Sequence, residues 1–148
     1  MTATVKIIEL SNHFKDALQI ASGDNRLNAL KAGGNVVRNH AKLNIQKQGL
    51  VDTGALQSSL SVEKDTDTTV AIGTNVKYGH IHEVGGTIVP RKAKMLSWID
   101  KQTGNRIFAK SVHIPARPYL RPALDENESD IIKAVGQNLL DQLKGILG

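Results

Sequence analysis

The sequence predicts an α+β domain in which two long helices pack on a mostly antiparallel sheet of four to five strands. Apolar residues recur with a period near 3.6 over residues 27–45 and again over 124–146, which indicates one amphipathic helix in each half of the chain. Between them, residues 59–114 hold short β-branched and apolar runs separated by turn-forming residues, as strands do. Strands grouped together, with helices to either side, favour helices packed on one face of a sheet.

The first fifty residues predict one strand and two helices. Residues 4–9 alternate as a short strand does, and residues 10–21 carry apolar side chains at helical spacing. A long helix then starts near Asp24, which we interpret as its N-cap, and continues to Gly49. Gly33 and Gly34 lie in its middle, where each glycine costs on the order of 1 kcal/mol relative to alanine. We therefore expect another element to pack closely there, or the helix to bend.

The middle of the chain predicts two β-hairpins. Residues 59–63 and 68–73 flank a polar turn, and residues 95–99 and 106–114 flank a second one. Residues 86–90 are extended and end at a proline, which is typical of a strand end or a sheet edge.

The remaining segments predict two shorter features and the last helix. Residues 51–60 open with a turn or cap and could continue as one helical turn, whereas residues 78–84 are ambiguous. Residues 122–147 predict a single long helix that starts at Pro122. Acidic residues crowd its first turns and lysines lie further on, as the helix dipole favours.

Composition predicts one soluble, cytosolic domain over residues 1–148. The chain has no cysteine, so a disulfide framework and a thiolate metal site are both excluded. Its longest apolar runs fall far short of the ~20 residues that cross a bilayer, and its first residues lack the pattern of a signal peptide.

The formal charge of +5 is concentrated in the middle of the chain. Residues 77–121 carry nine basic side chains against two acidic ones. A basic region of this kind could face a polyanion, face an acidic patch on a partner, or be an ordinary solvated surface.

A His-x-His-Glu sequence is the strongest candidate for catalysis or metal binding. His80, His82 and Glu83 resemble a metal or general-base site, but the zincin signature spaces its histidines four apart. A spacing of two separates the rings by roughly 200° on a helix, whereas on a strand they share a face. A third ligand from His113, His40 or an acidic residue would still be required.

Other reaction classes gain little support. An RNA-cleaving site could combine His80, His82 or His113 with a lysine, but nothing fixes a nucleophile, a base and an oxyanion donor together. Ser58 and Ser59 lack the nucleophile-elbow sequence, and the glycine pairs lack the pattern of a phosphate loop. The balance therefore shifts from enzymes to assembly or binding proteins.

A proline-rich segment precedes the last helix. Pro115, Pro118 and Pro122 fix the backbone, so little entropy is lost when the segment is ordered. Arg117 can donate two parallel hydrogen bonds, and Tyr119 supplies an amphipathic anchor. The segment could be a stiff linker that holds the helix on the sheet, a surface that contacts another subunit, or both.

Four further segments of the sequence form a recognisable series: DTGALQSSL (52–60), IGTNVKY (72–78), YGHIHEVGG (78–86) and IPARPYLR (114–121). In this order they resemble the tail-completion and virion-morphogenesis proteins of long-tailed bacteriophages, a group that includes the Mu-type tail-completion proteins. Departures from the family pattern are mild: Gly79 stands for a usual alanine, Tyr119 for a usual phenylalanine and Arg121 for a usual glycine.

This resemblance implies a non-enzymatic structural protein of the virion, with no catalytic residue, cofactor or metal. Such proteins are thought to form rings, commonly sixfold, that complete the tail at its head-proximal end and help it join the head. The implied partners are further copies of the chain, the tail tube protein and the head–tail connector proteins, with transient contact to passing DNA. Assembly would take place in the host cytoplasm, and no membrane is involved.

Two groups of residues are the candidate contacts for that role. A small basic nucleic-acid-binding or RNA-cleaving domain that uses His80 and His82 is the alternative. The candidate subunit or partner interface comprises Tyr78, His80, His82, Glu83, Arg117, Tyr119 and Arg121, and the candidate basic loop for a DNA channel or a partner comprises Arg91, Lys92 and Lys94.

Overall fold

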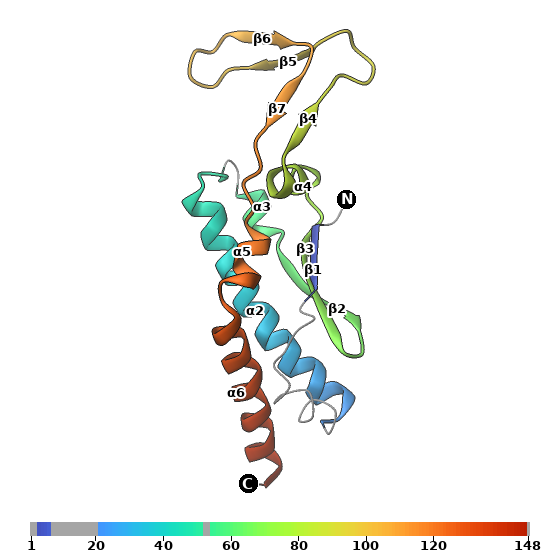
Figure 1. Ribbon diagram of the computed structural model, residues 1–148, viewed down its shortest axis with the longest axis vertical. Coiled ribbons are helices and arrows are strands. Elements are labelled where there is room, and N and C mark those ends of the chain that lie inside the picture. Colours follow the sequence, from blue (N-terminus) through green and yellow to red (C-terminus); the bar gives the residue numbers. More distant parts are fainter. Residues whose placement is uncertain (1–2, 7–20, 52–53, 148) are drawn as a thin grey trace.

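The computed structural model describes residues 3–6, 21–51 and 54–147, and within them the predicted α+β class is confirmed. The molecule is elongated, with its two long helices at one end and a two-stranded projection at the other (Figure 1). The helices are α2 (Gly23–Lys47), α3 (Ala55–Ser58), α4 (Lys77–Val84), α5 (Leu120–Asp125) and α6 (Glu128–Leu147). The strands are β1 (Ala3–Lys6), β2 (Ser61–Thr66), β3 (Thr69–Thr74), β4 (Gly86–Ile88), β5 (Leu96–Ile99), β6 (Arg106–Ala109) and β7 (Val112–Ile114).

The long helix of the first half is confirmed as α2, but its N-cap is Ser22 rather than Asp24. The Ser22 hydroxyl accepts a hydrogen bond from the Asn25 N–H at 3.4 Å. Asp24 lies instead in the first turn, where a negative charge is favoured by the helix dipole. The buried face of α2 carries Ala29, Leu30, Gly33, Gly34, Val37, Ala41 and Ile45, which follow the predicted period.

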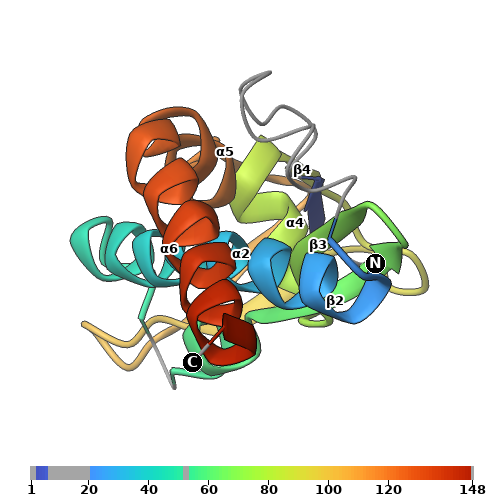
Figure 2. The same cartoon turned by 90° about the horizontal axis from the view of Figure 1, so that it is seen from below.

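The glycine pair confirms the expected close packing at the middle of α2. A Cβ on Gly33 would lie 2.8 Å from a methyl group of Val135 in α6, and a Cβ on Gly34 would lie 2.6 Å from a methyl group of Val62 in β2. The absence of a side chain at Gly33 therefore lets α6 pack closely on one side of α2, and its absence at Gly34 lets β2 pack closely on another side. Seen from the end of the molecule, α6 runs alongside α2 (Figure 2).

The prediction of a single sheet of four to five strands is wrong. The strands form an antiparallel three-stranded sheet in the order β1-β3-β2 and two separate ribbons, β4 with β7 and β5 with β6. The predicted strand over residues 106–114 divides at Lys110 and Ser111, because its first part pairs with β5 and its second part with β4. The last helix also packs chiefly on α2 rather than on the sheet.

The last helix is interrupted, so the prediction of one helix over residues 122–147 is also wrong. The Asn127 side chain donates to the Ala123 carbonyl at 3.0 Å, and the Asn127 carbonyl accepts from the Ile131 N–H at 3.0 Å. Asparagine competes in this way with regular helical bonds, so one helix ends and the next begins there. Pro122 lies in the first turn of α5, where its missing N–H costs little.

The other local predictions can be compared element by element. Residues 3–6 form a strand as expected, whereas residues 7–9 and the helix predicted for residues 10–21 lie outside the described residues. The first hairpin is confirmed as β2 and β3, and the helical turn after residue 54 as α3. The ambiguous residues 78–84 are helical, in α4.

Candidate functional site

The two conspicuous segments of the sequence lie against each other. The Arg117 N–H donates to the His82 carbonyl at 2.7 Å. Gly85 has a φ of 71°, and a Cβ on it would lie 2.7 Å from the Ala116 backbone nitrogen. A side chain at Gly85 would therefore be strained by the backbone conformation and blocked by the neighbouring chain. We call this contact region the clasp; it comprises α4, Gly85 and residues 115–121.

Glu83 is the central polar group of the clasp. Its carboxylate accepts hydrogen bonds from the backbone N–H groups of Tyr119 (2.8 Å), Leu120 (3.0 Å) and Arg121 (2.9 Å). The first N–H groups of a helix have no partner within it, and α5 has no side-chain cap of its own. A carboxylate from α4 supplies that cap, and its charge also complements the positive end of the α5 dipole.

Tyr119 joins the clasp to the core of the subunit. It is 0% exposed, and its hydroxyl donates to the Gly79 carbonyl at 3.0 Å. Burial raises the pKa of the Tyr119 hydroxyl, and the charge of Glu83 raises it further, so the hydroxyl remains a donor. Two side chains near the end of α2 complete the attachment: Asn44 donates to the Tyr119 carbonyl at 3.1 Å and Gln48 to the Pro118 carbonyl at 2.8 Å.

The histidines do not come together as a metal or acid–base site in the described part of the chain. His80 and His82 are both on helix α4, where a spacing of two directs them apart. His113 is on β7, with its Nδ1 3.3 Å from the Thr87 hydroxyl, and His40 is on α2. Among residues 3–6, 21–51 and 54–147, no group of three or more His, Asp or Glu side chains could hold a metal ion.

His82 is nevertheless in an unusual environment. Its ring packs edge-on against Tyr78, with centroids 5.9 Å apart, and its buried Nδ1 has no hydrogen-bond partner among the described residues. Burial lowers the pKa of His82, and the nearby positive charge of Arg117 lowers it further. The neutral imidazole is therefore the form that the clasp accommodates.

Acidification is expected to destabilise the protein through His82. The pKa of His82 is lowered on folding, so the unfolded chain binds more protons than the folded one as the pH falls. The contribution of the neutral His82 ring to stability is therefore complete above the ordinary histidine pKa of 6.5. It declines as the pH falls from there towards the lowered pKa. Urea unfolding midpoints measured from about pH 7.5 to about pH 5.5 should fall less for His82→Gln than for the wild type. Parallel curves for His82→Gln and wild type would contradict this assignment.

The remaining interface candidates differ in accessibility. Tyr78, Arg117 and Arg121 are exposed, whereas His80, His82 and Glu83 are half-buried. Arg121 forms an ion pair with Asp125 at 2.9 Å. Because Tyr119 is fully buried and Glu83 bonds within its own subunit, the exposed members are the ones available to another molecule.

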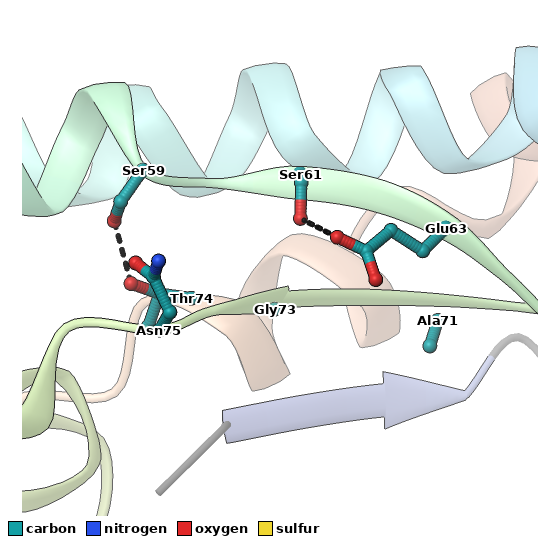
Figure 3. A pocket seen from close by; sticks show the side chains of 7 residues that line it. All are labelled: Ser59, Ser61, Glu63, Ala71, Gly73, Thr74 and Asn75. Carbon is teal, nitrogen blue, oxygen red and sulfur yellow. Dashed lines mark hydrogen bonds between the residues drawn. The ribbon is translucent and has the colours of Figure 1, made fainter.

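A polar hollow of about 480 Å³ lies over the β2–β3 pair (Figure 3). Ser59 and Thr74 share a hydrogen bond of 2.5 Å, and the Ser61 hydroxyl donates to Glu63 at 2.9 Å. Among the described residues that line it, the one ionisable side chain is that of Glu63, which is exposed. Its lining residues are Ser59, Ser61, Glu63, Ala71, Gly73, Thr74 and Asn75.

A projecting ribbon begins and ends at the clasp. We call residues 86–114 the β arm: β4 and β7 pair at its base, and β5 and β6 pair at its far end (Figure 1). The candidate basic loop lies between β4 and β5, and Arg91, Lys92 and Lys94 are all exposed. Neither ribbon makes more than marginal contact with another described element of the subunit.

Both faces of the far ribbon expose apolar side chains. Trp98 and Ile107 are cross-strand partners and lie on one face, whereas Ile99 and Phe108 lie on the other. Trp98 is 39% exposed and Phe108 is 58% exposed. Sequence reasoning did not single out these residues. The signal was available, because adjacent apolar residues on both strands of a two-stranded ribbon cannot all be buried on one face.

The exposed side of α6 has two chemical regions. Its start and the preceding α5–α6 junction are acidic, and its second half exposes leucines. The acidic residues are Asp125, Glu126, Glu128 and Asp130, and the exposed leucines are Leu140, Leu143 and Leu147.

Comparison with known protein families matches residues 25–143 to the phage virion morphogenesis family. The match contains both halves of the clasp and the whole β arm, together with all four segments that carried the resemblance. No curated protein and no solved structure gives a significant match. Of the helices in the described residues, none is both long and apolar enough to cross a membrane. The chain belongs to the phage virion morphogenesis family, and its role is in the structure or assembly of a bacteriophage particle.

Proposed function

We propose that the protein is a structural, non-enzymatic component of a long-tailed phage that forms a ring at the head-proximal end of the tail. In this position it completes the tail and assists its joining to the head, in contact with the tail tube protein and the connector proteins. The family membership of the chain and the resemblance of its four motifs to tail-completion proteins support this role.

The observation that carries the proposal is that no other described element of the subunit covers the β arm. An isolated two-stranded ribbon is marginally stable in water, and contiguous exposed apolar surface usually marks an interaction site. Here such a ribbon exposes tryptophan, phenylalanine and isoleucine on two faces. A partner that covers the arm would bury these apolar side chains and stabilise the ribbon. This arrangement suits a protein that acts inside an assembly.

A ring also requires two unlike surfaces on each subunit. A head-to-tail interface joins one patch to a different patch on the next copy, and rings close when the rotation per step allows it. The arm and the helical body are unlike surfaces of one elongated chain (Figure 1). The basic loop at Arg91, Lys92 and Lys94 would then face either a neighbouring protein or the passing genome, where weak phosphate contact permits movement.

Mass measurement and negative-stain imaging of the purified protein test the proposal. We expect discrete oligomers that appear as uniform rings with a central hole, in solution or after addition of tail tubes assembled from the tube protein of the same phage. A protein that remains monomeric in solution and leaves tube ends uncapped would contradict it. RNA cleavage, or duplex DNA binding in the nanomolar range at physiological salt, would instead favour the nucleic-acid alternative.

A further inference from the structure

We infer that the β arm docks on the exposed side of α6 in a second copy of the chain. This inference rests on the proposed ring, because it names the two surfaces that join neighbouring subunits. The molecule that covers the arm is therefore another copy of the chain, not the tail tube protein, a connector protein or DNA.

Charge complementarity favours a second copy. The β arm carries six basic side chains and one acidic one, so its formal charge is +5 and the rest of the chain is neutral. The acidic one, Asp100, accepts a hydrogen bond of 2.6 Å from the Thr103 hydroxyl in its own turn. The exposed acidic residues at the α5–α6 junction and the start of α6 carry the opposite charge to the arm, and one of them, Asp125, is paired with Arg121.

Apolar complementarity points to the same helix. A ribbon with exposed Trp98 and Phe108 requires an apolar surface as well as an acidic one. The second half of α6 exposes Leu140, Leu143 and Leu147, which lie on one side of the helix at spacings of three and four. The exposed surface of α6 therefore offers both kinds of side chain that the arm requires, acidic ones at its start and leucines in its second half.

The shape of the subunit makes the contact intermolecular. The arm projects from the clasp in one direction, and α6 runs from the clasp side of the molecule towards the opposite end (Figure 1). An arm that points away from its own α6 can meet only the α6 of a neighbour. Such a contact joins two different patches, which is the head-to-tail geometry of a ring.

Disulfide cross-linking tests the contact directly, because the chain has no cysteine of its own. Ser97→Cys introduces a thiol on the exposed ribbon, and Ser129→Cys introduces one at the exposed start of α6. We expect a mixture of the two single variants to give a cross-linked dimer on mild oxidation, and the double variant to give a ladder that ends at the ring. Thr68→Cys, in the exposed β2–β3 turn, is the matched control and should not cross-link to Ser97→Cys.

Charge exchange tests the same contact without cysteines. Lys92→Glu with Lys94→Glu, and separately Glu128→Lys with Asp130→Lys, should each weaken self-association by ~10-fold or more at low salt. A mixture of the two charge-reversed proteins should recover association, because each brings the complement of the other. Unfolding curves check that each variant folds. We expect them to match the wild type, because all four side chains are exposed.

The outcomes separate the inference from the proposed function. Suppose that rings form, that Ser97→Cys does not cross-link to Ser129→Cys, and that the mixed charge-reversed proteins do not regain association. This outcome would overturn the inference but would still support the proposed ring. If Ser97→Cys subunits cross-link only with one another, this result would also overturn the inference, in favour of a symmetric arm-to-arm contact. Cross-linked open chains that never close, in solution or on tail tubes, would support the arm contact and contradict the ring.

Discussion

Alanine in place of Glu83 is expected to lower the free energy of unfolding by about 3 kcal/mol, because three charge-assisted hydrogen bonds are lost together. The carboxylate caps the backbone N–H groups at the start of α5, which has no other side-chain cap. Without it, donors that are partly shielded from water are left without partners. Urea unfolding followed by circular dichroism measures the loss, and amide exchange at residues 119–121 should accelerate.

Two variants make this result specific. Glu83→Gln keeps the shape and one acceptor oxygen, so its loss should be smaller than that of Glu83→Ala. Glu63→Ala removes an exposed glutamate on β2 that accepts a hydrogen bond from the neighbouring Ser61 hydroxyl, and should change the free energy by no more than about 0.5 kcal/mol. A Glu83→Ala protein as stable as Glu63→Ala would show that the cap contributes nothing.

Alanine at Gly79 is expected to destabilise the protein by about 2 kcal/mol, and removal of the Tyr119 hydroxyl as well is expected to recover part of this loss. A Cβ on Gly79 would lie 2.9 Å from the Tyr119 hydroxyl and 2.7 Å from a methyl group of Thr74. The resembling family usually has alanine and phenylalanine at these two positions. The oxygen of Tyr119 therefore occupies space that the alanine methyl would otherwise use.

A double-mutant cycle measures this coupling. Tyr119→Phe alone should cost about 1 kcal/mol, because a buried hydrogen bond to the Gly79 carbonyl is lost. The double variant Gly79→Ala/Tyr119→Phe should be at least ~1 kcal/mol more stable than the sum of the single losses predicts. Alanine also favours the helical backbone of α4, but this gain is present in the single and the double variant alike and cancels in the cycle. Strictly additive losses would mean that the Thr74 methyl, not the hydroxyl, sets the limit.

Local patterns predicted α2 and the β2–β3 hairpin because their determinants are close in sequence. The period of α2, the turn between β2 and β3 and the close approach at Gly33 and Gly34 are all properties of short stretches. The division of the sheets was not predictable in this way. Pairing of β4 with β7 joins Gly86 to Ile114, and no local signal distinguishes that partner from the adjacent strands.

The candidate site was predicted as two separate segments, and their contact was missed. Nothing in the spacing of Glu83 indicates that it caps a helix that begins at Leu120, because any exposed carboxylate could serve. The histidines attracted attention by their residue type, whereas their placement on a helix directs them apart. The sequence left open whether the proline segment is a linker that holds the last helix on the sheet, a surface that contacts another subunit, or both. In the structure, the bonds from Asn44 and Gln48 attach the segment to α2 and its C-terminal cap, not to the sheet.

The clasp also makes the β arm separable from the rest of the fold. Both ends of the arm are fixed at one place, since Glu83 precedes β4 and the amides that it caps follow β7. Lengthening a loop whose ends are already held together costs only about 0.6 kcal/mol for each doubling of its length. Insertions, deletions and exchanges within the arm therefore leave the helical body nearly unchanged in stability. A virus can alter the reach and chemistry of the arm as its neighbours change, without redesigning the domain that carries it.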